Sequence, residues 1–473
     1  MIFTSYRQQK VEGVFDTVVI GSGMGGLTVA SLLARHAGKR VLILERHYTA
    51  GGFTHVFRRP GYEWDVGVHY IGQVNDPKSP VRAAYDYLTD GQLSWELMPD
   101  VYDRLILGDR EYEFLSDAQR FRARVLADLG CSQELAGVLT GQWGDYGSPA
   151  GRSSFGVHAL IAEHYFKGAS YPIGGASAIL ASMLPAIERA GGKLLVSAEV
   201  EEIIVDDRGR AAGVRMQDGR EIRAAQVISD AGAAANTYLR LLPRGVAQGL
   251  GVAQKLECIP ASTAHLCLYV GLKHSSAELG LRGSNLWVCP TADHDANVAR
   301  AEASPEQPLP FPFISFPAAK DPSFASSFPG RATIDVVAPA PFAWFEKWVD
   351  TRWKRRGSEY DEFKLRLAER LKNKMERWVP EVRGKIDYYE LPTPLSTRHF
   401  ANFDWGEIYG LAPVPERFRL DCLGPRTPVP GLYLTGVDTV ILGVTGALFG
   451  GALAASAILG RNLMGAISRQ RPA

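Results

Sequence analysis

The pattern of apolar side chains predicts a βαβ unit near the N-terminus. Thr17 to Ile20 is a short run of β-branched and apolar residues, and a helical segment follows at Leu27 to His36. Gly38 is placed to end this helix, because glycine adopts the left-handed conformation of a helix C-terminus without steric cost. Val41 to Leu44 then forms a second apolar strand. The unit is about thirty residues long, as expected for a strand–helix–strand unit.

The middle of the chain returns to this mixture of helix and strand. The segment from Ala176 to Ala190 carries apolar residues on one helical face and is followed by two glycines. Four short strands come next, and the turn sequences DRG and DG between them are typical of hairpins. The strands are Lys193 to Val196, Val200 to Val205, Gly213 to Met216 and Val227 to Ser229. We expect them to complete the sheet that the first βαβ unit begins.

A different pattern marks the region after residue 304. Residues 304–345 are rich in Pro and Phe, and strand-like stretches at Phe313 to Phe316 and Ala332 to Val337 predict an antiparallel sheet. Ser358 to Trp378 is an amphipathic helix whose second face is mostly charged. Residues 352–377 hold ten Lys or Arg against five Asp or Glu. This basic face is either solvated or a contact for a membrane surface.

The closing segment from Gly431 to Leu463 is apolar and has two charged residues, Asp438 and Arg461. By length alone such a segment is able to span a bilayer. Glycines interrupt it at six positions, which favours a buried strand, a Gly-rich turn and a buried helix that begins at Gly446.

The glycine motif after the first strand predicts a dinucleotide site. Gly21 permits the tight turn, Gly23 lets the backbone approach a pyrophosphate, and Gly26 allows the helix to pack closely on the strand. Glu45 ends the second strand, where its carboxylate accepts hydrogen bonds from ribose hydroxyls. The candidate contacts in this loop are Gly21, Ser22, Gly23, Met24, Gly25, Gly26 and Glu45.

The residues after Glu45 favour FAD over NAD. Arg46 and the glycine pair Gly51-Gly52 follow at once, whereas a nicotinamide dehydrogenase continues with further βα units. A second glycine pair indicates a loop folded under a longer cofactor that extends towards an isoalloxazine ring. We therefore predict FAD as the cofactor, with Arg46, Gly51, Gly52 and Val200 among its contacts.

The C-terminal segment predicts the flavin end of the same site. Leu432 to Leu434 is a strand, Gly436 and Asp438 lie in the turn after it, and the Asp438 carboxylate is placed to bind the ribityl chain. A helix that begins near Gly446 points its positive end at the flavin, which stabilises an anionic reduced flavin. The candidates here are Gly436, Asp438, Thr445, Gly446 and Ala447, and Asp438 is alternatively a helix cap.

Composition excludes several classes of protein. Lys and Arg number 52 against 51 Asp and Glu, for a formal charge of +1, whereas a nucleic-acid-binding protein needs a basic excess. The five cysteines are scattered and form no CxxC pair, so we expect neither a disulfide framework nor a metal site. The first sixteen residues contain no apolar run long enough for a signal peptide. We expect a cytoplasmic location, with membrane association as an addition.

Taken together, these motifs resemble the retinol saturase, carotenoid isomerase and bacterial phytoene desaturase family of FAD-dependent oxidoreductases. VVIGSGMGGLTVASLLARHAGKRVLILERH is similar to the family's flavin signature, GYEWDVGVHYIG to its saturase branch, and YPIGGASAI to its Gly-Gly segment. ELPTPLSTRHF, GEIYGLAPVPERF and GLYLTGVDTVILGVTGAL match later segments, so the resemblance covers most of the chain. Phe53-Thr54 departs from it, because amine-oxidase relatives carry a basic residue at the first position and the saturase branch tends to have cysteines.

The resemblance implies an α/β fold. We expect a Rossmann-like FAD-binding domain of the glutathione-reductase and amine-oxidase type, with an inserted α+β substrate domain built on an antiparallel sheet. The order of elements assigns residues 1–75, 186–250 and 425–473 to the discontinuous FAD-binding domain. Residues 76–185 and 251–424 form the substrate-binding domain, which includes helical segments.

The resemblance also implies chemistry on a carbon–carbon double bond of a long hydrophobic polyene or isoprenoid, by saturation, desaturation or isomerisation. No second GxGxxG motif is present, so electrons are exchanged with an external carrier or returned to the substrate. Such chemistry needs a proton donor or acceptor. His69, with Tyr70 beside it, is the first candidate, Tyr409 the second and Glu407 the third; each is alternatively a packing or capping residue.

Two other functions fit the same type of fold. One is a flavin amine oxidase, which needs an aromatic cage beside the flavin. The other is a non-catalytic escort for prenylated proteins. The intact Gly21, Gly23 and Gly26 argue against the escort, because such chains lose glycines of the flavin signature.

Overall fold

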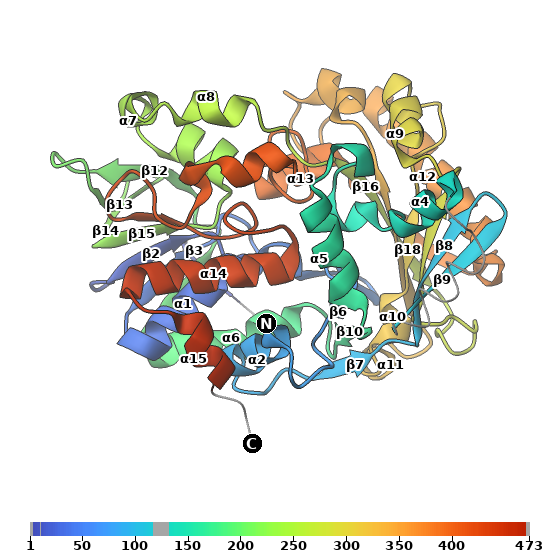
Figure 1. Ribbon diagram of the computed structural model, residues 1–473, viewed down its shortest axis with the longest axis horizontal. Helices are drawn as coiled ribbons and strands as arrows, with labels where there is room; N and C mark the ends of the chain where they lie inside the picture. The colour runs from blue at the N-terminus through green and yellow to red at the C-terminus, as the bar shows by residue number, and fades with distance from the viewer. Residues whose placement is uncertain (1–2, 10, 117–131, 470–473) are drawn as a thin grey trace.

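A six-stranded parallel sheet forms the centre of one half of the protein (Figure 1). The computed structural model describes residues 3–9, 11–116 and 132–469. The sheet has the order β1-β11-β3-β2-β15-β21, and each neighbouring pair is parallel. Its strands are β1 (Thr4–Ser5), β11 (Lys193–Val196), β3 (Val41–Leu44), β2 (Thr17–Ile20), β15 (Gln226–Ser229) and β21 (Leu432–Leu434). The predicted bounds of β2, β3 and β21 are confirmed.

Helices cover one face of this sheet. α1 (Met24–Ala37), α6 (Ser177–Arg189) and α14 (Gly443–Leu459) share a core with side chains of β2 and β3. α1 ends at Gly38 with φ 57°, as its sequence predicts. All residues of β2 and β3 are buried, as expected for a parallel sheet with both faces covered.

The hairpin strands of the middle segment correct one prediction. β12 (Val200–Val205), β13 (Ala211–Met216) and β14 (Glu221–Arg223) form a separate antiparallel sheet instead of extending the parallel one. Their apolar residues pack on the second face of the six-stranded sheet. The physical reason is their alternating pattern, because a strand with one polar face is not suited to a sheet that is buried on both sides.

The other half of the protein contains the antiparallel sheet that the Pro- and Phe-rich region predicts. Seven strands lie in the order β20-β16-β19-β18-β17-β8-β9, and every pair except β17 and β8 is antiparallel. The strands are β20 (Ile386–Glu390), β16 (His265–Leu272), β19 (Ala332–Pro339), β18 (Phe313–Ser315), β17 (Asn285–Cys289), β8 (Val101–Leu107) and β9 (Arg110–Leu115). α12 (Ser358–Trp378) has the predicted bounds and packs its apolar face on this sheet.

The apolar C-terminal segment folds as β21, a turn, α14 and α15 (Leu463–Arg469). α14 begins at Gly443, three residues before the predicted start. Its glycines bring it close to α1, since a Cβ added at Gly451 would lie 2.6 Å from the backbone oxygen of Gly25. Among the described residues, none of the helices is long and apolar enough to cross a membrane.

The remaining elements connect these sheets. They are β4 (Val56–Arg59), β5 (Tyr62–Asp65), β6 (Ile71–Gly72), β7 (Trp95–Leu97), β10 (Ala169–Pro172), α2 (Pro80–Leu88), α4 (Gln133–Leu139), α5 (Phe155–Tyr165), the π-helix η4 (Ala233–Leu241), α7 (Arg244–Gly249), α8 (Val252–Glu257), α9 (His294–Ala303), α10 (Pro317–Lys320), α11 (Phe324–Ser327), α13 (Pro394–Ala401) and short 3₁₀ turns, η2 (Trp143–Tyr146) among them.

The domain limits assigned above stay a prediction. α2 and α6 share the core of α1 and the parallel sheet, although residues 80–88 and 177–185 fall within the predicted substrate domain. We propose that both helices belong with the cofactor half.

Candidate active site

A cavity of about 1110 Å³ lies between the parallel and the antiparallel sheet. At one end it is lined by the loops that follow β2, β3 and β15, which are the carboxyl ends of parallel strands, where open α/β sheets bind ligands. At the other end it is lined by side chains of the antiparallel sheet. The predicted site residues that line it are Gly21, Ser22, Gly23, Met24, Glu45, Arg46, Gly52, His69, Tyr70, Val200, Tyr409, Gly436, Thr445, Gly446 and Ala447.

The first end is built from backbone. Gly21 has φ 98°, in the region that favours glycine. A Cβ at Gly23 would lie 2.6 Å from Asp230 Oδ2, and a Cβ at Gly25 would lie 2.5 Å from the nitrogen of Gly436. Gly23 precedes the first turn of α1 and has no side chain to cap it, and the backbone N–H groups of Gly23 and Gly26 face the Asp230 carboxyl. The start of α1 is therefore a place where N–H groups meet an acidic oxygen. This end fits a pyrophosphate lying on the start of α1.

Glu45 fixes the glycine loop as well as facing the cavity. Its Oε2 accepts hydrogen bonds from Ser22 N at 2.9 Å and Ser22 Oγ at 2.6 Å, and its Oε1 accepts from His47 N at 2.8 Å. Ser22 Oγ in turn accepts from Gly51 N at 2.9 Å. The acid, the first glycine loop and the second glycine pair are therefore one hydrogen-bonded unit. Gly51 does not line the cavity, and it supports the loop through its hydrogen bond to Ser22.

Asp438 does not line the cavity, in contrast to its predicted position against a ribityl chain. Its Oδ2 accepts from Ala233 N at 2.9 Å and its Oδ1 accepts from Leu411 N at 3.0 Å. The carboxylate therefore ties the start of η4 to the segment after β20. We propose that Asp438 is a positioning residue, and that Thr445, Gly446 and Ala447 in the first turn of α14 approach the cofactor instead.

Asp230 is a residue that the sequence analysis missed. It follows β15 and lines the cavity, and hypothetical Cβ atoms at Gly23, Gly25 and Gly436 would all lie 2.6 Å from its carboxyl oxygens. Burial raises the pKa of Asp230 to about 7. The signal was present, because an acid directly after an apolar strand is the feature that marked Glu45.

His69 lies at the second end of the cavity, between the two sheets. Its Nδ1 is 3.5 Å from Asp335 Oδ2, and its ring meets Phe313 edge-on at 5.2 Å between centroids. Burial, with the nearby Lys320 ammonium as a second cause, lowers the pKa of His69 to about 3. The imidazole is therefore neutral at physiological pH, which makes it a poor proton donor.

The other two predicted catalytic residues differ in position. Tyr409 lines the cavity, and burial raises the pKa of its phenol far above the usual value. Glu407 is buried outside the set of residues that line the cavity. Its Oε2 accepts from Trp405 N at 3.0 Å, and burial raises the pKa of its carboxyl to about 7. Glu407 thus holds its own loop, and we propose a structural role for it.

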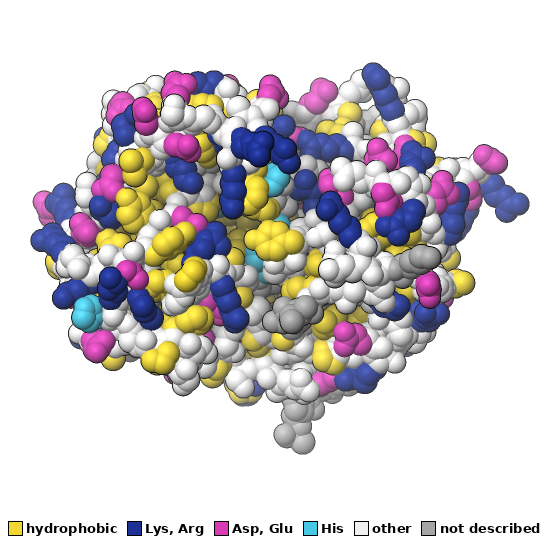
Figure 2. Space-filling view, turned by 180° about the vertical axis from the view of Figure 1, so that it is seen from behind, with side chains coloured by type: hydrophobic (Ala, Val, Ile, Leu, Met, Phe, Trp, Pro, Cys, Tyr) yellow, Lys and Arg dark blue, Asp and Glu magenta, His cyan; other side chains and the backbone are white. Residues whose placement is uncertain are grey.

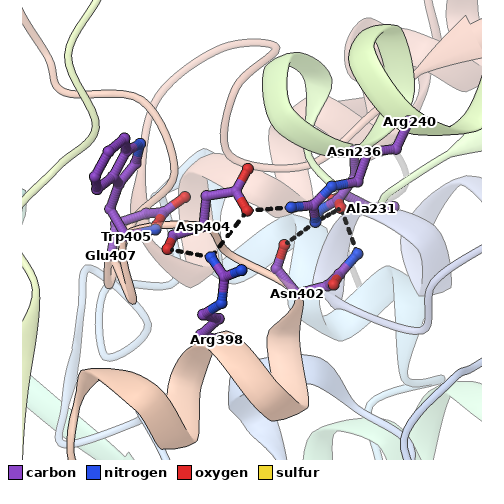
Figure 3. Close-up of polar contacts among 8 residues, drawn as sticks. All are labelled: Ala231, Asn236, Arg240, Arg398, Asn402, Asp404, Trp405 and Glu407. Atoms are coloured by element: carbon purple, nitrogen blue, oxygen red, sulfur yellow. Dashed lines mark hydrogen bonds and ion pairs between the residues drawn. The ribbon is translucent and has the colours of Figure 1, made fainter. Parts of the chain in front are cut away.

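A polar network holds that loop against η4 (Figure 3). The Asp404 carboxylate binds both Arg240 and Arg398, and Arg398 also donates to the Asp404 backbone oxygen at 2.8 Å. Asn402 Nδ2 donates to Asn236 Oδ1 at 2.7 Å. Neighbouring Phe403 lines the cavity and stacks on Phe53, with ring centroids 6.3 Å apart. The network therefore fixes one aromatic wall of the cavity.

Comparison with known proteins identifies the family. Residues 19–88 match the NAD(P)-binding Rossmann-like domain, and residues 78–267 match the flavin containing amine oxidoreductase family. The chain is 33% identical to the all-trans-retinol 13,14-reductase of Danio rerio, over 97% of this chain and 88% of that protein. The chain belongs to the all-trans-retinol 13,14-reductase family. Prolycopene isomerase 2 of an Oncidium hybrid cultivar is a weaker relative within the curated proteins, with 27% identity over 89% of this chain and 80% of that protein.

Solved structures agree on the fold. Cyclohexylamine oxidase from Brevibacterium oxydans IH-35A superposes with a TM-score of 0.57 and 17% identity, covering 97% of this chain and 99% of that chain. The α/β fold with a Rossmann-like domain is thereby confirmed. Members of this family are FAD-dependent oxidoreductases. The cavity fits their cofactor because the glycine loop before α1 lines one end of it and apolar side chains line the other.

Proposed function

We propose that this protein saturates a carbon–carbon double bond of a retinoid-like polyene. The observation that carries the proposal is the second end of the cavity, whose walls include Trp287, Phe311, Phe313 and Val337. Such a wall suits a long apolar chain and offers it few hydrogen-bonding partners. The name of the 33% identical relative supports a reductase within this substrate class.

Saturation requires a hydride at one carbon and a proton at its neighbour. A bound reduced FAD supplies the hydride. The protein's own residues hold the cofactor at the glycine loop, exclude water with the aromatic wall, and deliver the proton. An external electron carrier reduces the flavin between turnovers, since the sequence contains one GxGxxG motif and no second nucleotide domain is apparent from it.

The experiment is an anaerobic incubation of the chemically reduced holoprotein with all-trans-retinol, followed by mass spectrometry. We expect a product two hydrogen atoms heavier than the substrate and an equal amount of reoxidised flavin. A product of unchanged mass with the flavin still reduced indicates isomerisation, and no reaction with retinoids or carotenoids contradicts the proposal.

The two rival functions give different results with the purified protein before its flavin is reduced. An amine oxidase reduces its oxidised flavin when an amine is added without oxygen. An escort protein without bound flavin is colourless. We expect a yellow protein, because the glycines of the flavin signature are intact. We expect that amines do not change its spectrum, because the 33% identical relative is named a retinol reductase.

We further propose that the protein takes its substrate from a membrane surface through α5. Phe155 and Leu160 on this helix are 81% and 58% exposed, and Leu160 and Ile161 also line the cavity. α12, the basic helix for which the sequence left membrane contact open as an alternative to a solvated face, buries its apolar face on the antiparallel sheet. Figure 2 shows the opposite side of the molecule from Figure 1, and both basic and acidic side chains lie on it.

Sedimentation with liposomes tests this contact. The double variant Phe155→Ser, Leu160→Ser should bind less than the wild type. Leu365→Ser is the matched control, because Leu365 on α12 is 53% exposed and lies on its outer face. Equal binding by all three proteins, or no binding by the wild type, contradicts the role of α5.

A further inference from the structure

Tyr70 lies between two carboxyl groups at the second end of the cavity. Its hydroxyl oxygen is 2.9 Å from Asp103 Oδ2 and 3.1 Å from Asp145 Oδ2. A phenol has one proton and donates to one of these oxygens at a time. The other contact is a hydrogen bond when that carboxyl group carries a proton and donates it to the Tyr70 oxygen. The geometry therefore indicates that one of the two carboxyl groups, Asp103 or Asp145, is protonated.

Asp103 is the ionised member of the pair. It is fully buried, and it accepts hydrogen bonds from Gln142 Nε2 at 2.7 Å, Asn285 Nδ2 at 2.9 Å and Trp287 Nε1 at 2.9 Å. The indole nitrogen only donates. The ammonium group of Lys320 donates to Asn285 Oδ1 at 2.5 Å, which fixes the Asn285 amide with its NH₂ towards Asp103. Burial raises the pKa of Asp103, and these three donors oppose that shift because they stabilise a carboxylate. Tyr70 is the remaining partner, and its hydroxyl donates to this carboxylate.

Asp145 is the protonated member. Within the described residues, the hydrogen bond shown for its side chain is the one to Tyr70. Burial and the charge of Asp103 both raise the pKa of Asp145 well above its usual range. The chain of hydrogen bonds therefore runs from the Asp145 carboxyl to the Tyr70 oxygen, and from the Tyr70 hydroxyl to the Asp103 carboxylate.

Asp145 also has access to a substrate. It belongs to the 3₁₀ turn η2 and lines the cavity, together with Trp287, Phe311 and Tyr409. Asp103 does not line the cavity. Of the two acids, the one that holds the proton is thus the one that faces the apolar space. A neutral acid in such surroundings is suited to donate a proton to carbon.

We propose that Asp145 is the catalytic acid of this protein, and that Tyr70 and Asp103 are the positioning residues that hold its proton. The inference rests on the proposed saturation. Reduced FAD, held at the glycine loop, would supply a hydride with its two electrons to one carbon of the substrate double bond. Its neighbour takes the proton of the Asp145 carboxyl, so one O–H bond breaks and one C–H bond forms. The Tyr70 hydroxyl turns to donate to the new Asp145 carboxylate, and a solvent proton restores the acid after product release.

The first test does not depend on the substrate. The infrared difference between wild-type and variant holoprotein isolates the C=O band of one protonated carboxyl group. It separates this band from those of other buried acids whose pKa values are raised, such as Asp230, Asp335 and Glu407. Asp145→Asn should remove this band, whereas Asp109→Asn, an exposed acid in the turn between β8 and β9, should retain it. Loss of the band in Asp103→Asn but not in Asp145→Asn would place the proton on Asp103 and overturn the assignment.

The second test uses single turnovers of the reduced holoprotein with all-trans-retinol. Asp145→Asn should load FAD normally and reoxidise it about 10²–10⁴-fold more slowly than the wild type. Asp145→Glu should restore part of the rate, and Tyr70→Phe should shift the pH profile of the rate. A folded, yellow Asp145→Asn protein that reoxidises at the wild-type rate overturns the proposal. If the wild type itself fails with every polyene, the proposed function fails, and the infrared result still decides where the proton is.

Discussion

The two ends of the cavity are built by different means. At the cofactor end, a glycine loop leaves main-chain atoms uncovered by side chains, and the Ser22–Glu45 hydrogen bonds hold this loop in place. The substrate end consists of side chains from separate strands, among them Tyr70, Asp103 and Asn285. Asp103 and Asn285 are 182 residues apart in the chain. The glycine loop is therefore sensitive to added side-chain atoms. The substrate end is instead sensitive to the protonation state of its acidic side chains.

The largest effect is expected from filling the cofactor end. Gly23→Val should give colourless protein, because its Cβ would lie 2.6 Å from Asp230 Oδ2 and the glycine loop would have to shift from the position that we expect to bind the pyrophosphate. Gly245→Val is the control, since a Cβ there meets nothing within 4 Å. Absorbance at the flavin bands measures loading, and circular dichroism checks the fold. A yellow, fully loaded Gly23→Val protein would rule out this site for FAD.

A smaller loss is expected from removing Glu45. Glu45→Ala should weaken FAD binding by about 1.5–3 kcal/mol, the value of a hydrogen bond to a charged group, which corresponds to roughly 10- to 150-fold in Kd. Titration of the apoprotein with FAD gives this number. Glu416→Ala, which removes an exposed acid from a surface turn, should leave the Kd unchanged. Equal Kd values for the two variants would show that Glu45 acts on neither the loop nor the ribose.

Asp230 makes FAD binding depend on pH. Burial raises the pKa of Asp230 to about 7, and the charged groups nearest to it, Glu45 and Asp438, are both acidic. Below pH 7 the carboxyl is neutral beside the pyrophosphate, and above pH 7 it is an anion that repels it. The Kd for FAD should therefore rise by up to about tenfold per pH unit above pH 7. Asp230→Asn should flatten this dependence, and a wild-type Kd that is constant from pH 6 to 9 would contradict it.

The smallest effect on the rate of flavin reoxidation is expected from replacing His69 at the substrate end. His69→Gln should slow the oxidation of reduced flavin by the polyene less than about tenfold, because the neutral imidazole is not the proton donor in this account. Asp145→Asn measured beside it should be slower by a far larger factor. The opposite order of the two variants would return the acid role to His69.

Local patterns explain which features the sequence could predict. β2, β3 and α12 have their predicted bounds, because each depends on the period of apolar residues within one segment. The alternating pattern of the hairpin strands was present in the sequence, but their packing on the second face of the parallel sheet depends on tertiary contacts and was missed. The direction of the Asp438 side chain and the Asp145–Tyr70–Asp103 group were not predictable for the same reason. Each is defined by partners that lie far away in the chain.

The central claim is that the flavin at the cofactor end and the Asp145 carboxyl at the substrate end act on the same double bond. The most direct test is the anaerobic mixing of reduced holoprotein with one equivalent of all-trans-retinol, following flavin absorbance and product mass together. The account predicts that the flavin is reoxidised in step with formation of a dihydro product, and that Asp145→Asn stops both signals while retaining its flavin. Flavin that stays reduced in the wild type with retinoids and carotenoids alike, or a dihydro product formed equally fast by Asp145→Asn, would contradict it.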